Sequence, residues 1–101
     1  KPLEPCTYTF DRSHKVKTDQ LAEGKFYAID LYEVYNIEFS TFRNCYESGI
    51  FMILKLYEPE SRSFGICTTR KAEIMNLRTG EVKTIESTPC DFYEAVLSSP
   101  L

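Results

Sequence analysis

Residues 50–58 read IFMILKLYE, and this stretch decides the fold class more firmly than any other part of the chain. Gly49 precedes it and Pro59 follows it, and both are residue types that commonly bound strands. Every second residue is apolar, which gives one continuous face made of Ile50, Met52, Leu54 and Leu56. An apolar period of two predicts a β-strand with one face on the core.

A second strand is predicted at residues 25–35, KFYAIDLYEVY. Both of its alternating sets of side chains are mostly apolar, which is typical of a strand covered on both faces, as in a barrel with a helix or tail packed outside. Asp30 and Glu33 are the exceptions, one in each set. Because a charge taken out of water is costly on its own, each of the two needs water or a partner group.

A hairpin is predicted in the second half of the chain. Residues 72–77 and 81–85 flank the three-residue connection Arg78-Thr79-Gly80. A connection of this length that ends in glycine suits a type I turn followed by a left-handed residue. The two flanking segments are therefore expected to pair as antiparallel strands.

The remaining internal segments carry weaker signals, because their composition is mixed or polar. We expect a short helix or ordered loop at 11–23, a strand continued through Phe39 and then a turn anchored by Cys45 within 36–48, a turn at 60–62, and a short strand at 63–69. These segments would connect the stronger strands.

The segment TPCDFYEAV, which begins at Thr88, predicts a short C-terminal helix. Thr88 suits the N-cap, Pro89 the first helical position, and Asp91 the positive end of the helix dipole. One helical face would then be apolar, formed by Phe92, Ala95 and Val96. This helix would pack on the β-structure.

Composition and charge bound the class of protein. A chain of 101 residues fits one domain, 1–101, whose seven Tyr and seven Phe predict an aromatic core in a mainly β fold. The formal charge of −3 comes with no basic cluster, so no nucleic-acid partner is expected. The longest apolar run, 50–54, is far shorter than the roughly 18 residues of a membrane span.

Four cysteines, Cys6, Cys45, Cys67 and Cys90, lie far apart along the chain. Zinc and thiol-redox sites use close pairs such as Cys-x-x-Cys, and no such pair occurs. We therefore favour two disulfides and an oxidising, extracellular compartment over four buried thiols in a cytosolic protein.

Residues that carry catalytic chemistry are few. His14 is the only histidine, it lies in a polar segment, and we interpret it as a solvated side chain. The carboxylate pairs Glu58–Glu60 and Asp91–Glu94 are interpreted as turn and helix-cap acids rather than as an acid–base pair. The four glycines are isolated turn residues, so no phosphate loop is present. We expect no enzymatic activity, no cofactor and no metal.

Tyrosine offers a rigid apolar body with a polar tip, which suits a binding surface. Five tyrosines are candidates for such a surface: Tyr27, Tyr32, Tyr35, Tyr46 and Tyr57. We expect most of them to be core or half-buried strand residues instead.

The order of features in residues 67–97 resembles the netrin-like domain found in tissue inhibitors of metalloproteinases. In that family a strand-end cysteine precedes a hairpin, which leads into Cys-Asp-Phe and a short helix; here Cys67, the hairpin at 78–80 and Cys90-Asp91-Phe92 follow in that order. Size, cysteine number and the N-terminal segment are also similar to netrin-like excretory-secretory proteins of parasitic hookworms. The resemblance implies a five-stranded OB-type barrel with a short C-terminal helix.

The resemblance also bears on the disulfides and on protease inhibition. Four cysteines allow three connectivities, and the resemblance implies that Cys6 reaches Cys67 or Cys90; we favour Cys6 with Cys90 and Cys45 with Cys67. Inhibitors of this family chelate the protease zinc through a free N-terminal cysteine. Here Cys6 follows Lys1-Pro2-Leu3-Glu4-Pro5, so that chelating amine is absent and inhibition by this mechanism is not expected.

Three hypotheses about function follow. The first is a secreted, monomeric interaction module, immunomodulatory in character, that binds an extracellular or host protein through one surface. The second is a protease inhibitor that acts through a loop at 36–48 or 59–64. The third is a small-ligand carrier with an aromatic-lined barrel mouth.

Overall fold

The computed structural model describes residues 7–37, 40–62 and 67–98, and this part of the chain is mainly β with no α-helix. Its elements, in chain order, are β1 (Thr7–Lys15), the 3-10 helix η1 (Thr18–Gln20), β2 (Phe26–Ile37), β3 (Ser40–Leu56), β4 (Glu60–Arg62), β5 (Cys67–Thr69), β6 (Lys71–Asn76), β7 (Val82–Glu86) and β8 (Asp91–Ser98). The mainly β class predicted from the sequence is confirmed.

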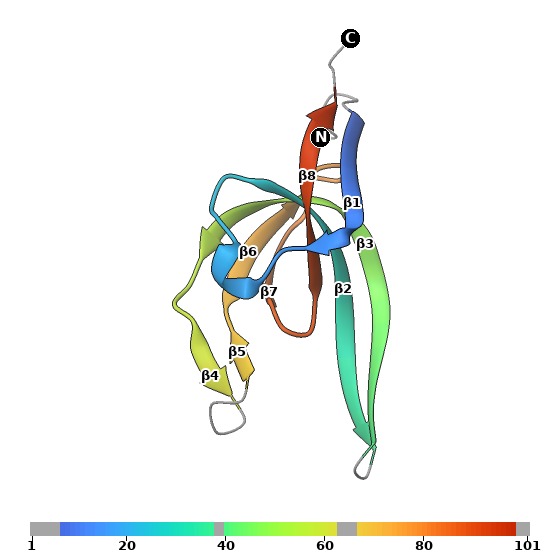
Figure 1. The fold of residues 1–101 in the computed structure, drawn as a ribbon, viewed down its shortest axis with the longest axis vertical. Coiled ribbons are helices and arrows are strands. Elements are labelled where there is room, and N and C mark those ends of the chain that lie inside the picture. Colours follow the sequence, from blue (N-terminus) through green and yellow to red (C-terminus); the bar gives the residue numbers. More distant parts are fainter. Residues whose placement is uncertain (1–6, 38–39, 63–66, 99–101) are drawn as a thin grey trace.

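The strands form one large antiparallel sheet and a small separate ribbon (Figure 1). The six-stranded sheet has the order β1-β8-β2-β3-β6-β7, and β4 pairs with β5. β1 pairs with β8 and β7 pairs with β6, so these two strands form opposite edges and the sheet is not closed. The closed OB-type barrel implied by the resemblance is therefore not supported.

The core lies on one face of the sheet, where the central strands present large apolar side chains. In β2, Tyr27, Ile29 and Leu31 point to this face and are almost fully buried. They pack with buried residues of the neighbouring strands and of the segment after η1, namely Leu21, Phe51, Ile53, Ala72, Ile74, Ile85 and Phe92. Ala28 and Asp30, on the opposite face of β2, are buried as well, so residues 27–31 are covered on both faces. The expectation is wrong for the outer part of the predicted strand, where residues 33–35 are exposed.

β2 and β3 continue beyond the core as a long hairpin that projects from the body of the molecule (Figure 1). Leu31 pairs with Glu47, and the next residue, Tyr32, pairs with Cys45. Tyr46 is therefore the extra residue of a β-bulge, which re-aims the strand where it leaves the body. The turn expected at Cys45 is wrong, because Cys45 lies within β3.

The predicted C-terminal helix is also wrong, since Asp91–Ser98 is strand β8. β8 hydrogen-bonds to β1 on one side and to β2 on the other, and two ladders of bonds outweigh weak local helix signals. Thr88 does not cap a helix: its hydroxyl donates to the backbone oxygen of Thr68, and the Thr88–Pro89 peptide is cis. These residues form the turn between β7 and β8.

The hairpin predicted in the second half of the chain is present, whereas two other segments differ from the prediction. The hairpin around 78–80 is confirmed, with Gly80 at a positive φ of 78°. The 11–23 segment begins as part of β1 and holds only the short η1 as helix, and 60–62 is strand β4 rather than a turn. Both segments form strands because a partner strand, β8 or β5, supplies the hydrogen bonds.

Candidate functional site

The outer half of the β2–β3 hairpin, residues 32–37 and 40–45, forms an arm. Val34 lies opposite Arg43, and Tyr35 lies opposite Phe42. Opposed residues in an antiparallel pair share a face, so the arm has a Val34–Arg43 face and a Tyr35–Phe42 face. Val34, Tyr35 and Phe42 are 49%, 48% and 55% exposed; these three side chains are called the arm patch below.

Arg43 connects the arm to the turn before β8. Its guanidinium lies over the ring of Tyr32, 3.9 Å from the ring centroid. Nη1 donates to the backbone oxygen of Pro89 at 3.1 Å and contacts Oδ1 of Asp91 at 3.4 Å. Stacking on one side and hydrogen bonds at one nitrogen fix the plane of a side chain that is otherwise partly open to solvent.

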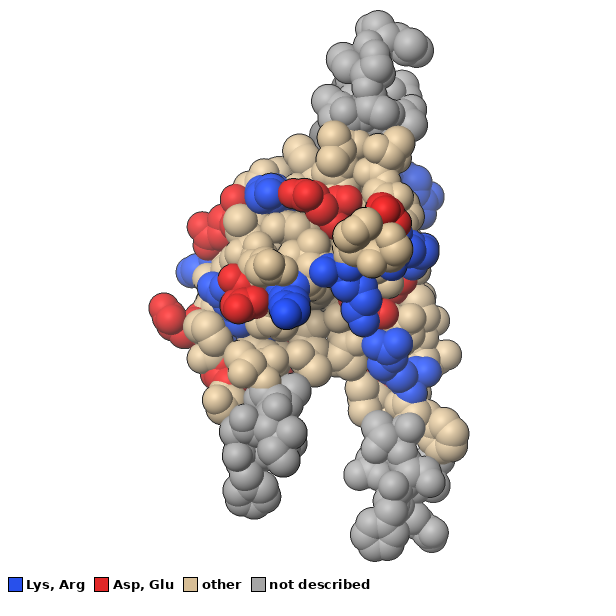
Figure 2. Space-filling view, viewed as in Figure 1, with Lys and Arg blue, Asp and Glu red and all other residues tan. Residues whose placement is uncertain are grey.

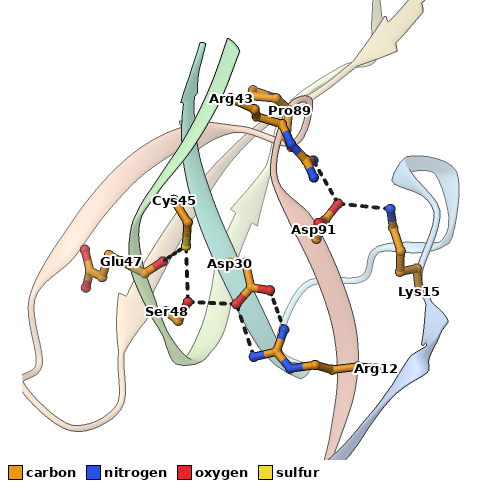
Figure 3. Close-up of polar contacts among 9 residues, drawn as sticks. All are labelled: Arg12, Lys15, Asp30, Arg43, Cys45, Glu47, Ser48, Pro89 and Asp91. Atoms are coloured by element: carbon orange, nitrogen blue, oxygen red, sulfur yellow. Dashed lines mark hydrogen bonds and ion pairs between the residues drawn. The ribbon is translucent and has the colours of Figure 1, made fainter.

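Two carboxylates face each other beside this arginine. Asp30 of β2 and Asp91 of β8 are directly opposed in register, and each side chain is only 10% exposed. Like charges in opposed positions destabilise a sheet unless cations compensate them. Figure 3 shows the compensation: Arg12 contacts Asp30, whereas Lys15 and Arg43 both approach Asp91.

The surroundings of Asp30 keep it ionised. Burial alone would raise its pKa, but hydrogen bonds from Arg12 and Ser48, together with the charge of Arg12, hold the pKa below its ordinary value. The prediction that Asp30 needs a partner is thus confirmed. Glu33 also has one, because the hydroxyl of Tyr35 donates to its carboxylate.

Two open hollows adjoin the root of the arm. The first, about 530 Å³ and called the aromatic hollow, is lined by Tyr32, Val34 and Tyr46 on the β2–β3 side, and by Thr69, Thr84, Ile85, Glu86, Thr88, Pro89 and Cys90. The second, about 450 Å³ and called the cationic hollow, is lined by Lys15, Lys17, Arg43, Asp91, Val16, Thr18, Ser87, Thr88, Pro89, Cys90 and Phe92. They share the turn residues 88–90.

The candidate tyrosines separate into two groups. Tyr27 belongs to the core and its hydroxyl accepts a hydrogen bond from the backbone N–H of Ala22, while Tyr32 is half-buried. Tyr35, Tyr46 and Tyr57 are exposed. The expectation that most of the five would be core or half-buried is therefore wrong, and two of the exposed ones, Tyr35 and Tyr46, lie on or beside the arm.

The structure does not support the two predicted disulfides. Cys45 and Cys90 are free thiols, Cys6 lies outside the described residues, and of Cys67 only the backbone is described. Burial raises the pKa of the Cys90 thiol, so Cys90 is a weakly reactive cysteine.

His14 is exposed, as predicted, and lies in a bulge of β1. Its Nδ1 contacts both Asp11, at 2.9 Å, and the hydroxyl of Ser13, at 3.1 Å. In a catalytic triad the two ring nitrogens divide these roles, so this cluster lacks triad geometry. Two hydrogen bonds from Ser13 and one from His14 lower the pKa of Asp11 to about 2.

The carboxylate pairs named from the sequence do not come together as sites. Asp91 and Glu94 lie on opposite faces of β8, and Glu94 pairs with Lys25 at 2.8 Å. Glu58 and Glu60 are both exposed. The acids that the fold does bring together are Asp30 and Asp91, a pairing that depends on the β2–β8 register.

Arg43 is the main site residue that the sequence did not reveal. A hairpin centred between Tyr35 and Phe42 would have placed Arg43 opposite Val34. The alternation of apolar side chains was the available signal, but residues 36–41 contain no glycine or proline to mark a turn.

Comparisons with known proteins give no relative: no family model, no curated protein and no solved structure matches the chain. Among the described residues, no group of three or more His, Cys, Asp or Glu side chains is arranged to hold a metal ion. In the same part of the chain, no helix is long and apolar enough to cross a membrane.

Proposed function

We propose that this chain is a secreted, non-catalytic interaction module that binds an extracellular protein through the arm patch. The observation that carries the proposal is the exposure of Val34, Tyr35 and Phe42 on two paired strands that project from the body. Isolated exposed apolar residues are ordinary, whereas an opposed pair such as Tyr35 and Phe42 on a projecting element is typical of a contact surface. Val34 adds exposed apolar surface on the other face of the same arm.

The residue types of the arm also support protein recognition. Tyrosine and arginine are enriched among the residues that contribute most to binding energy at interfaces. Tyr35 lies on one face of the arm, and Arg43 is held on the other by Tyr32. A partner that grips the arm from both sides would therefore meet an aromatic anchor and a fixed cation.

Secretion, kinship with the netrin-like family and an immunomodulatory effect on a host protein remain parts of this proposal. Secretion is inferred from the sequence alone, from the wide spacing of the four cysteines, and the free Cys45 and Cys90 add no support to it. The order of Cys67, the hairpin and Cys90-Asp91-Phe92 supports the family. Of the segments considered as inhibitory loops, residues 40–48 and 60–62 are paired strand. This regular pairing favours the interaction module over a loop-type protease inhibitor.

Quantitative capture from serum tests the proposal with a matched control. Val34→Ser and Phe42→Ser remove apolar surface from the arm patch, whereas Val82→Ser makes the same change on β7 at a site with the same 49% exposure. The wild-type protein and Val82→Ser should capture one saturable partner, and the two arm variants should lose at least about tenfold in affinity. Absence of a saturable partner, or equal capture by all variants, contradicts the proposal.

A further inference from the structure

The aromatic and cationic hollows adjoin at the turn at 88–90, since both are lined by Thr88, Pro89 and Cys90; the two hollows together are called the cleft. Arg43 lines the cationic hollow and lies against Tyr32 of the aromatic hollow. Each hollow, at about 530 and 450 Å³, falls within the range of small-molecule pockets in proteins, roughly 300–1,000 Å³.

Charge is divided unevenly between the two halves. Lys15, Lys17 and Arg43 line the cationic hollow with one acid, Asp91. The aromatic hollow has no cation and one acid, Glu86. The chain as a whole has a formal charge of −3, so a hollow lined by more cations than acids differs in sign from the net charge of the molecule. Figure 2 shows Lys and Arg side chains that follow one another from the middle of the molecule toward the arm.

The cations of this hollow keep hydrogen-bonding capacity toward a ligand. Both polar contacts of Arg43 with described residues use Nη1, and a guanidinium carries five N–H donors. Lys15 contacts Asp91 at 3.1 Å while its side chain is 59% exposed. Figure 3 shows the two side chains converging on Oδ1 of Asp91 from different strands, so an anion that meets both lies on the solvent side of this carboxylate.

The aromatic half supplies the complementary apolar surface. Tyr32 and Val34 line it from β2, and the bulge turns Tyr46 of β3 toward the same hollow. Burial raises the pKa of the Tyr46 hydroxyl, and Lys83 lies 5.8 Å from the centre of its ring. Neutral aromatic walls of this kind suit the flat or aliphatic body of a small molecule.

We propose that the cleft binds a small organic anion. The anionic head, a carboxylate, sulfate or phosphate group, contacts the remaining N–H groups of Arg43 and Lys15, and the apolar body lies against Tyr32, Val34 and Tyr46. The two unequal halves fix the orientation, because an anion is favoured only at the cationic end. Val34 belongs to both the arm patch and this cleft, and Arg43 lies beside it, so a protein bound to that face of the arm would compete with the anion. Anion binding is therefore measured on the chain alone.

Titration followed by amide NMR spectra tests the site with three probes: naphthalenesulfonate, the uncharged naphthalenemethanol, and inorganic sulfate. Naphthalenesulfonate should bind at least about tenfold more tightly than either of the other two, because only it fills both halves. The shifted amides should belong to residues 43–46 and 86–92. Equal affinity for the uncharged probe, or shifts confined to other parts of the sheet, overturns the proposal.

Substitutions test the contribution of each half of the cleft to binding separately. Arg43→Gln should weaken naphthalenesulfonate binding about tenfold, while Lys71→Gln, an exposed lysine on β6 outside both hollows, should leave it unchanged. Tyr46→Ala should weaken both aromatic probes and leave sulfate unaffected. If Arg43→Gln disturbs the fold, as its amide spectrum would show, Tyr46→Ala decides: unchanged affinity for naphthalenesulfonate then overturns the proposal.

Discussion

Asp30 and Asp91 are held side by side on neighbouring strands, in positions where two charges repel and solvent is largely excluded. Their negative charges are compensated by Arg12 and Lys15 of β1 and by Arg43 of β3. The pair therefore fastens the edge strand β1 and the arm to the central strands. These charged side chains therefore hold the strands together through ion pairs rather than through apolar contacts.

Acid should weaken this arrangement. The folded-state pKa of Asp30 is lowered from its ordinary value of 3.8, so its contribution to the free energy of unfolding is present above that value and is lost as the pH falls through the lower, folded-state pKa. Urea unfolding of the wild type at about pH 6 and about pH 3 should show a loss of stability at the lower pH. Hydrogen bonds from Lys83 and Lys25 lower the pKa of Glu47 and Glu94 as well, so these acids add to the loss.

Asp30→Asn isolates the part due to Asp30. The loss of stability between the two pH values should be smaller in Asp30→Asn than in the wild type, because the substituted side chain does not titrate. Asp19→Asn, at an exposed position in η1, serves as the control and should show the wild-type loss. An unchanged pH dependence in Asp30→Asn would contradict the role assigned to this carboxylate.

At the scale of elements, the sequence predicted the strands and turns whose signals lie within the segment itself. The strands at 25–35 and 50–58 and the hairpin at 78–80 follow from period-two alternation and a turn glycine, which are local signals. The core face expected for 50–58 is wrong, because Phe51 and Ile53 are fully buried whereas Leu54 is 37% exposed. β8 was mistaken for a helix because Thr88, Pro89 and Asp91 match a helix start. The neighbours that override this match are far away in sequence, and so is the partner that places Arg43 opposite Val34.

The choice between strand and helix for β8 makes a prediction about two side chains. A helix would bury Phe92 and Val96 on one face, whereas the strand leaves Phe92 3% exposed, in T-shaped contact with Tyr27, and Val96 57% exposed. Phe92→Ala should lower the free energy of unfolding by about 3–5 kcal/mol. Val96→Ala should change it by no more than about 0.5 kcal/mol.

Urea unfolding measures both variants against the wild type. Similar costs for Phe92→Ala and Val96→Ala would favour the helix and contradict the strand. Circular dichroism on the folded variants checks that neither substitution changes the secondary structure.

At the scale of the whole molecule, the core and the arm have different sources of stability. The strands of the body are held by hydrogen bonds and by a shared apolar core that reaches from β8 to β7. Apart from the contacts of Arg43 with Pro89 and Asp91, the arm has the hydrogen bonds of one hairpin, and Val34, Tyr35 and Phe42 lie exposed on its two faces. A two-stranded hairpin without a packed face is only marginally stable by itself.

Hydrogen exchange should therefore divide the molecule at the Tyr46 bulge. Amides of the arm, at 32–35 and 42–45, should exchange faster than those at 27–31 and 51–53, because the arm can open without exposing the core. The hairpin of β6 and β7 is the internal control: it lies at the edge of the sheet but buries Ala72, Ile74 and Ile85, so it should exchange slowly.

Mass-spectrometric exchange at two protein concentrations distinguishes local opening of the arm from protection by a second copy of the chain. Slow exchange of the arm at both concentrations contradicts this division, and protection that grows with concentration shows that the arm patch binds a second copy of the chain and contradicts the expected monomer.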